Sequence, residues 1–430
     1  MKFSHIRTCI TPPVGTGLCG YVRKATSTGI TDDLYVQLLL LEDDRGRRLL
    51  LASADLIGFE TEFVDGIKRW IGTQDERLTP ASINFNASHT HGAPATMRIA
   101  TVDGQRYPND YTRFLRRRIK MAIAEVLRAP METGSLHVGM GRCRLGINRR
   151  LPVRMKRGRR WVTEVLMQPN PAGSTDSALG VLRVKGVGRE ILVVNYACHP
   201  TATGATYAFT ADYPGFASRA LRAEGGQQRE VMFLQGAGGD IRPPCLTGDG
   251  KLFKPAEVHE VAAFGQAIAV SVGNVLRKKM TRLRPVFRAH DGSVLYPYDK
   301  QRACREDPFK EYAAIRDWRL RTGSADGINL KWTVWRLASQ CCFIAVPGEA
   351  CHMIGKKAKR RSGAAFPFFL GYTNGCPGYI PTDKIIREGG YEGFRSIEPY
   401  GHPHPFRPGA ERMLHASLGE GLSACLLHAR

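Results

Sequence analysis

Several apolar, strand-like runs of this 430-residue chain end in polar side chains that can bind a metal. The pattern places His89 and His91 after residues 83–87, His199 after 191–197, Asp240 after 231–234, and Glu349 after 339–346. In α/β sheets, ligands bind at the carboxyl ends of the strands. The recurrence therefore predicts an α/β fold with a functional site at this edge.

The segments between these runs also favour an α/β fold. Residues 34–41 and 49–57 are apolar and flank Asp43-Asp44-Arg45-Gly46, which predicts a β-hairpin. The succession of strand, helix and strand patterns predicts a parallel βαβ unit at 191–197, 211–221 and 231–234. We further expect helices at 61–70, 111–127 and 259–275, a short strand at 8–15, and a basic, loop-rich segment between strands at 134–141 and 178–184. Residues 288–335 give no clear pattern.

Basic residues outnumber acidic ones, with 62 Lys and Arg against 39 Asp and Glu and a formal charge of +23. This balance favours anionic partners. The charge is densest at 116–118, 154–160 and 356–361, and none of these patches carries the interleaved aromatic residues of a nucleic-acid motif. Nucleic acid is therefore not an expected partner. Two interpretations remain, a solvated basic face and a surface for an anionic lipid or substrate.

The cysteines indicate a reducing compartment. Eleven are scattered through the chain, Cys341 and Cys342 are adjacent in an apolar run, and no Cys-x-x-Cys pair suggests a zinc ribbon. The N-terminus lacks the apolar core of a signal peptide, and no apolar run reaches the roughly 20 residues of a membrane helix. We therefore expect a soluble, cytoplasmic protein.

Two imidazoles and a carboxylate around an open position are what catalytic Zn²⁺ requires. Each residue also has a structural interpretation: His199 as a core or capping histidine, Asp240 in a turn, and Glu349 at a helix N-terminus. The glycines at 236–239 do not form a dinucleotide fingerprint or a P-loop, and Gly-x-Ser-x-Gly is absent, which disfavours the serine-hydrolase elbow.

Motifs along nearly the whole chain resemble, in order, those of the catalytic domain of neutral (non-lysosomal) ceramidases. They are Ile10-Thr11-Pro12-Pro13-Val14-Gly15, Ser88-His89-Thr90-His91-Gly92-Ala93-Pro94, Asn148-Arg149, Cys198-His199-Pro200-Thr201, Gly239-Asp240-Ile241-Arg242-Pro243, Val346-Pro347-Gly348-Glu349, Gly378-Tyr379-Ile380-Pro381-Thr382 and Tyr391-Glu392-Gly393. The resemblance implies a single catalytic domain over 1–430 with a mixed β-sheet core flanked by helices. The immunoglobulin-like C-terminal domain of true ceramidases has no room here.

The resemblance also implies a site. The zinc ligands would be His89, His199, Glu349 and Tyr379, while His91 and Arg149 would orient or polarise the scissile carbonyl. Asp240 is a further candidate, as a carboxylate that orients a ligand histidine.

One position departs from the family motif. Arg242 stands where ceramidases carry the serine of Gly-Asp-Val-Ser-Pro-Asn, and a guanidinium there suits a substrate that bears an anion or carboxylate. Two functions follow. The first is a zinc-dependent hydrolase of a C–N amide in a small-molecule or lipid substrate. The second is a catalytically silent protein that binds anionic lipid, as at a membrane surface, through a basic face. The sequence gives no indication of oligomeric state.

Overall fold

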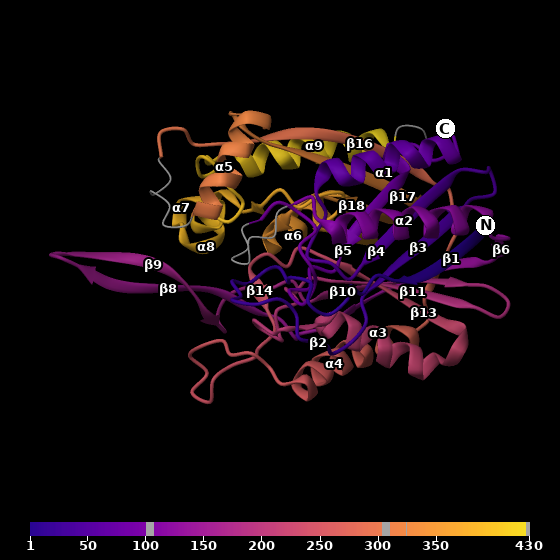
Figure 1. Cartoon of the computed structure of the whole chain (residues 1–430). Helices are drawn as coiled ribbons and strands as arrows, with labels where there is room; N and C mark the ends of the chain where they lie inside the picture. Colours follow the sequence, from indigo (N-terminus) through magenta and orange to yellow (C-terminus); the bar gives the residue numbers. More distant parts are fainter. Residues whose placement is uncertain (100–106, 303–309, 324, 427–430) are drawn as a thin grey trace.

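Three main β-sheets form the body of the molecule in the computed structural model, which describes residues 1–99, 107–302, 310–323 and 325–426 (Figure 1). The first sheet has the order β5-β4-β3-β1-β6, with bounds Ile83–Ala87, Arg48–Ala54, Tyr35–Glu42, Lys2–Cys9 and Glu132–Thr133. The second has the order β13-β11-β10-β7-β15, with bounds Arg229–Gln235, Glu190–Tyr196, Ala178–Lys185, Ser135–Arg142 and Thr281–Leu283. The third has the order β16-β17-β18-β20, with bounds Arg288–Pro297, Gly327–Ala338, Cys341–Ala345 and Phe366–Leu370.

Central strands such as β3 and β18 are mainly apolar because both faces of their sheets are buried there. Along β3, Leu39 and Leu41 face a core shared by all three sheets, whereas Val36, Leu38 and Leu40 face helices α1 (Thr61–Gln74) and α2 (Asp110–Arg128). The outer face of the second sheet packs on α3 (Asp212–Gly225) and α4 (Val258–Leu276), and that of the third on α6 (His352–Arg361) and α9 (Ala410–Ala424). The predicted α/β class is confirmed, with three packed sheets at its centre.

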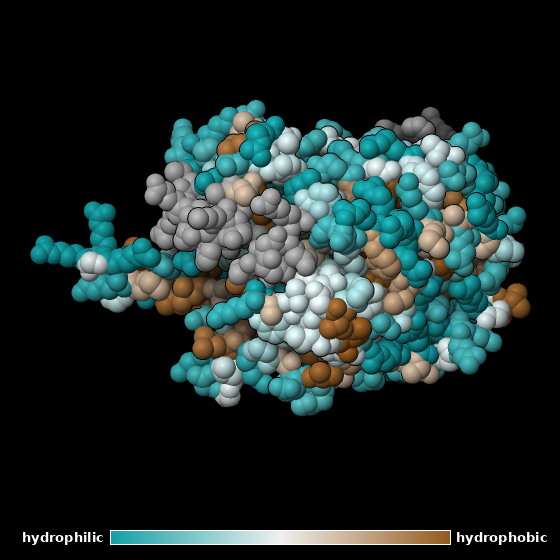
Figure 2. Space-filling model, viewed as in Figure 1, coloured by the Kyte–Doolittle hydropathy of each residue, from teal (hydrophilic) through white to brown (hydrophobic). Residues whose placement is uncertain are grey.

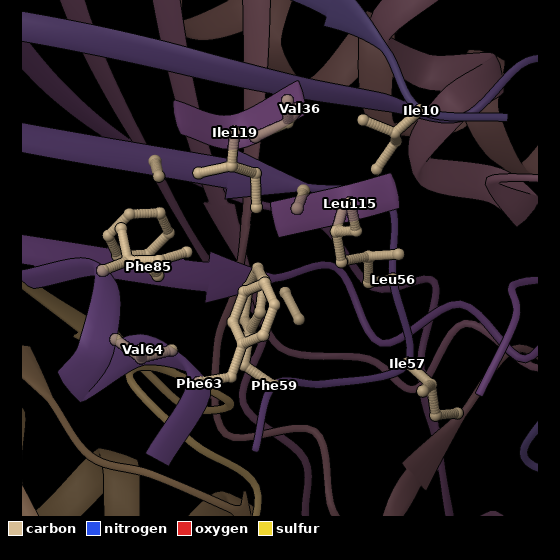
Figure 3. Packing of buried hydrophobic residues seen from close by; sticks show 14 of the residues in the cluster. Ile10, Val36, Leu56, Ile57, Phe59, Phe63, Val64, Phe85, Leu115 and Ile119 are labelled. Carbon is tan, nitrogen blue, oxygen red and sulfur yellow. The ribbon is translucent and has the colours of Figure 1, made fainter. Parts of the chain in front are cut away.

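Aromatic side chains fill the core between α1 and β5. Figure 3 shows Phe59, Phe63 and Phe85 close together, and the rings of Phe59 and Phe85 meet edge to face with centroids 5.9 Å apart. Leu115 and Ile119 of α2 belong to the same cluster. This packing against α1 supports the end of β5, the strand that precedes His89 and His91. None of the helices in the described part of the chain combines the length and the apolar composition that a bilayer crossing requires.

Each of the three main sheets contains one parallel strand pair connected through a helix. These pairs are β4 and β5 through α1, β11 and β13 through α3, and β18 and β20 through α6. The predicted parallel βαβ unit is therefore confirmed at β11, α3 and β13. The hairpin of β3 and β4 and the helices expected at 61–70, 111–127 and 259–275 are also present.

Two sequence expectations were wrong. The first strand runs from Lys2 to Cys9 and not over 8–15, since β1 pairs with β3 and ends before Pro12. The segment expected to be loop-rich forms a long antiparallel hairpin, β8 (Ile147–Arg157) and β9 (Arg160–Asn170), which projects from the body at the left of Figure 1. The unplaced segment 288–335 contributes β16, helix α5 (Lys310–Thr322) and β17.

Candidate metal centre

His89 and His91 lie in the turn after β5 and not within the strand. β5 ends at Ala87, and His89 has a left-handed φ of 67°. The turn, and not the alternation of side chains along a strand, therefore brings the two imidazoles together. The His89 N–H donates to the Leu56 carbonyl at 2.9 Å and thereby holds the turn. A positive φ costs a residue with a Cβ about 1–3 kcal/mol, so the surroundings must impose this conformation.

Asn86 ties the ends of the three sheets together. From the penultimate residue of β5, its Oδ1 accepts the Gln235 N–H at the end of β13 at 2.8 Å. Its Nδ2 donates to the Gly371 carbonyl just after β20 at 2.7 Å and lies 2.9 Å from the Thr373 hydroxyl. Since Asn86 is fully buried, these bonds also satisfy its amide. The carboxyl ends of strands from three sheets thus meet around one side chain.

Three imidazoles converge at this meeting point. The Nε2 atoms of His89 and His199 are 3.1 Å apart, and Nε2 of His91 lies 3.3 Å from the first and 3.1 Å from the second. The three ligand nitrogens form a group that could hold a metal ion. His89 and His199 are each 1% exposed, so water scarcely reaches them.

Backbone carbonyls fix the proton positions on two of these rings. Nδ1 of His89 faces the Ile57 carbonyl at 2.5 Å, and Nδ1 of His199 faces that of Gly238 at 3.3 Å. A ring nitrogen that faces a carbonyl must carry the proton, which leaves Nε2 with a lone pair for a metal. Burial, and then the neighbouring His89, lower the pKa of His199 well below its usual range. His199 is therefore kept neutral, the form that binds metal.

Glu349 brings a carboxylate to the same point. Its Oε2 lies 3.1 Å from Nε2 of His89 and 3.6 Å from Nε2 of His199, yet it is buried without a hydrogen-bond partner among the described residues. Its Oε1 accepts the Tyr400 hydroxyl. Burial raises the pKa of Glu349, but the neighbouring His89 ring and the hydroxyls of Tyr400 and Tyr379 outweigh it and hold this pKa below its usual value. A buried, ionised oxygen without a donor fits a cation ligand.

Strand pairing brings Tyr379 beside Glu349, and Arg149 in turn contacts Tyr379. Residue 379 pairs with Glu349 between the short parallel strands β19 (Glu349–Ala350) and β21 (Tyr379–Ile380). Nη2 of Arg149 donates to the Tyr379 hydroxyl at 2.8 Å, and its Nε donates to Glu392 at 2.7 Å. Burial raises the pKa of Tyr379 well above its usual range, although Arg149 opposes this. A cation beside the hydroxyl favours its ionised form, which a metal ligand needs.

His91 differs from the other two histidines in its surroundings. Its Nδ1 is buried without a partner among the described residues and lies against Gly20, where a Cβ in place of the glycine hydrogen would come within 2.4 Å of that nitrogen. Its ring packs against Tyr21 with centroids 4.9 Å apart, and at 9% it is the most exposed of the three. Burial, then His89, lowers the pKa of His91. No carbonyl fixes its tautomer among the described residues, so Nε2 can carry either a proton or a lone pair.

The two remaining candidates lie at the margin of this cluster. The Asp240 carboxylate accepts the backbone N–H and the Nδ1–H of His352, both at 2.7 Å, so the histidine it orients lies outside the cluster, contrary to expectation. Nε of Arg242 donates to the Thr201 hydroxyl at 3.1 Å, and its guanidinium covers the Phe253 ring at 4.5 Å. Neither the bond to Thr201 nor the contact with the Phe253 ring involves a hydrogen bond from Nη1 of Arg242.

No protein-family model and no curated protein sequence matches this chain. A solved structure of a ceramidase complexed with C2 superposes with a TM-score of 0.76, covering 98% of this chain and 75% of that chain at 15% identity. The chain has the ceramidase fold. Neutral ceramidase from Pseudomonas aeruginosa gives the same TM-score and identity, covering 98% and 74% of the two chains. The ceramidase-like fold expected from the motifs is confirmed.

Three residues of this centre were not assigned a role from the sequence. Tyr400 donates to Glu349, Glu392 pairs with both Arg149 and Arg150, and His352 binds Asp240. Glu392 was visible only as part of the Tyr391-Glu392-Gly393 motif. Tyr400 and His352 carried no local signal, because their partners are distant in the chain or on another sheet.

Proposed function

We propose that this protein is a zinc-dependent hydrolase that cleaves the C–N amide bond of an N-acyl, ceramide-like substrate. The observation that carries the proposal is the convergence of two imidazoles with fixed tautomers on a buried carboxylate oxygen that lacks a donor. The ceramidase fold supports the substrate class. Arg242 favours a substrate with an anionic group near the acyl amide.

The zinc ligands would be Nε2 of His89 and His199, an oxygen of Glu349 and the hydroxyl of Tyr379. A bound zinc ion supplies a Lewis acid that lowers the pKa of water and polarises a carbonyl. Arg149 is already charged and immobile, since Glu392 and Tyr379 hold it at 2.7 and 2.8 Å. Its role would be to stabilise the negative charge that develops on the carbonyl oxygen. His91 would face the substrate and move a proton through Nε2.

Turnover of an acyl-amide panel tests this function. We expect hydrolysis of at least one N-acyl substrate, with kcat/KM falling about 1,000-fold on chelation, since a metal supplies several kcal/mol of transition-state stabilisation and each 1.36 kcal/mol is tenfold. Added Zn²⁺ should restore activity. Activity that survives chelation, or no turnover across the panel, would reject the proposal.

The β8–β9 hairpin favours a second property, binding to an anionic membrane surface. Five exposed cations surround its tip, at positions Arg154, Lys156, Arg157, Arg159 and Arg160. Glu164 pairs with Arg157 at 2.5 Å and offsets only one of them. Trp161 is 58% exposed and lies under the Arg154 guanidinium at 5.1 Å. In Figure 2 the arm ends in a hydrophilic tip, with hydrophobic side chains nearer the body.

The hairpin also begins beside the candidate metal centre. Asn148 at the start of β8 pairs with Ile241 of β14 (Ile241–Arg242), and Arg149 follows it. An isolated two-stranded hairpin is marginally stable in water, so contact with a surface would stabilise it. Tryptophan and arginine are suited to the interface between headgroups and water. A tip bound to lipid would hold the centre near a lipid substrate.

Vesicle binding tests the hairpin with matched variants. Arg159→Ser with Arg160→Ser should weaken binding to phosphatidylserine-containing vesicles about 30-fold, because each cation near an anionic surface contributes about 1 kcal/mol. The control is Lys278→Ser with Lys279→Ser, which removes the same charge from exposed lysines after α4. Equal weakening by both pairs would show that net charge alone acts. Tighter binding to duplex DNA than to the vesicles would also contradict the proposal.

A further inference from the structure

A chain of hydrogen bonds joins Ser174, His352 and Asp240 outside the histidine cluster. The Ser174 hydroxyl lies 2.8 Å from Nε2 of His352. Nδ1 of the same ring lies 2.7 Å from Oδ2 of Asp240, whose other oxygen accepts the His352 N–H at 2.7 Å. Asp240 and His352 are buried, whereas Ser174 is exposed. The arrangement thus presents a surface hydroxyl backed by a buried imidazole and carboxylate.

The proton positions follow from the partners. Burial raises the pKa of Asp240, but contact with His352 outweighs this and holds it below its usual value. A carboxylate that faces Nδ1 requires the proton on that nitrogen. Nε2 of His352 then has a lone pair and accepts the Ser174 hydroxyl proton. These are the relations of nucleophile, base and orienting carboxylate in serine hydrolases.

The loop that carries Ser174 is fixed from two sides. One face of α6 holds it, because the Lys356 ammonium donates to the Thr175 carbonyl at 3.2 Å and Lys359 pairs with Asp176 at 2.5 Å. Residues 352, 356 and 359 lie on one side of a helix. From the other side, Nδ2 of Asn148 donates to the Ser174 carbonyl at 3.0 Å. Such second contacts are what hold a reactive side chain in place.

We propose that Ser174 is a nucleophile toward carboxylic esters, with His352 as general base and Asp240 as the positioning residue. Ser174 lies after β9, far along the chain from Arg242. It therefore does not replace the serine that ceramidases carry at the position of Arg242. The site uses none of the residues proposed to bind zinc. The inference therefore stands or falls independently of the amidase proposal.

The reaction balances with water alone. The Ser174 Oγ forms a bond to the ester carbonyl carbon while its proton passes to Nε2 of His352. The bond between that carbon and the alkoxy oxygen then breaks, and His352 returns the proton to the departing alcohol. Water next attacks the acyl-serine, gives its proton to His352 and releases the carboxylic acid as the proton returns to Ser174.

A fluorophosphonate probe on the full-length protein tests the proposal by mass spectrometry. We expect one phosphonyl adduct, mapped to Ser174, that is absent from Ser174→Ala and present in the control Ser177→Ala from the same loop. His352→Gln should slow labelling at least about 100-fold, the usual contribution of a general base. Chelation should leave the labelling rate unchanged, and Ser174→Ala should keep its zinc and its N-acyl turnover.

Other outcomes overturn the inference. The absence of an adduct at Ser174 would show that the hydroxyl is not activated. An unchanged labelling rate in a folded His352→Gln variant, checked by its thermal unfolding midpoint, would show that the imidazole is not the base. If His352→Gln does not fold, the comparison of Ser174→Ala with Ser177→Ala still decides the nucleophile.

Discussion

Replacing His89 or His199 with alanine is expected to lower the zinc affinity by more than about 100-fold. This loss exceeds the one expected when a residue that only hydrogen-bonds a metal ligand is removed. Each change removes an Nε2 lone pair whose tautomer a backbone carbonyl sets. The remaining residues cannot compensate, because Glu349 would then have one imidazole fewer beside its unpartnered oxygen. The measurement is the dissociation constant for zinc from competition with a chromogenic chelator, with N-acyl turnover followed in parallel.

His415→Ala is the matched control for these two variants. Like them, His415 is a buried histidine, but it lies on α9, and its ring nitrogens have no hydrogen-bond partners among the described residues. Its variant should bind zinc like the unmodified protein. A zinc affinity that is unchanged in His199→Ala would show that the metal binds elsewhere.

Arg149→Gln is expected to lower kcat about 100- to 1,000-fold, the effect of removing one donor to a developing oxyanion, while His89, His199 and Glu349 retain the zinc. The guanidinium is 3% exposed and positioned by Tyr379 and Glu392. Glu392 keeps a cationic partner in this variant, because Nη1 of Arg150 donates to its other oxygen at 2.7 Å. Steady-state kinetics and metal analysis on the same preparation provide the measurement.

Arg150→Gln is the matched control, from the adjacent residue and with the same carboxylate partner. Its guanidinium donates to Glu392, Glu388 and the Gly389 carbonyl, whereas the Tyr379 hydroxyl is bound by Arg149. This variant should be less stable, but its kcat should fall less than about tenfold, because Arg149, the proposed donor to the carbonyl oxygen, is retained. Equal losses of kcat in both variants would assign the arginine pair a structural role only.

The sequence predicted the parts of the fold in which local pattern and burial agree. Strands such as β3 and β18 are buried on both faces, so their runs are continuously apolar. β1 was misplaced because Ser4 and His5 are buried polar residues, and His5 is satisfied by Gln37 on a neighbouring strand at 3.2 Å. The β8–β9 hairpin was missed although the half-buried Leu151, Val153 and Met155 alternate with exposed positions, since basic residues dominated the segment.

For the candidate site, too, prediction succeeded only where the local sequence carries a signal. The two histidine segments and Glu349 follow apolar strands, a signal that local sequence carries. Tyr379 and Arg149 were reached only through family resemblance, because β-pairing between distant segments brings them in. The roles of the Ile57 and Gly238 carbonyls could not be predicted, since they depend on contacts 32 and 39 residues apart. Asp240 remains a candidate, and its partner His352 was not foreseen.

The zinc content of His91→Ala tests the proposed metal centre most directly, because Nε2 of His91 lies as close to Nε2 of His199 as that of His89 does. If His89, His199, Glu349 and Tyr379 hold the metal, purified His91→Ala should retain one zinc per chain by plasma mass spectrometry and lose N-acyl turnover at least about 100-fold, the usual contribution of a proton-transferring group. Loss of zinc from this variant, to the level of His89→Ala, would contradict the division of roles and make His91 a ligand.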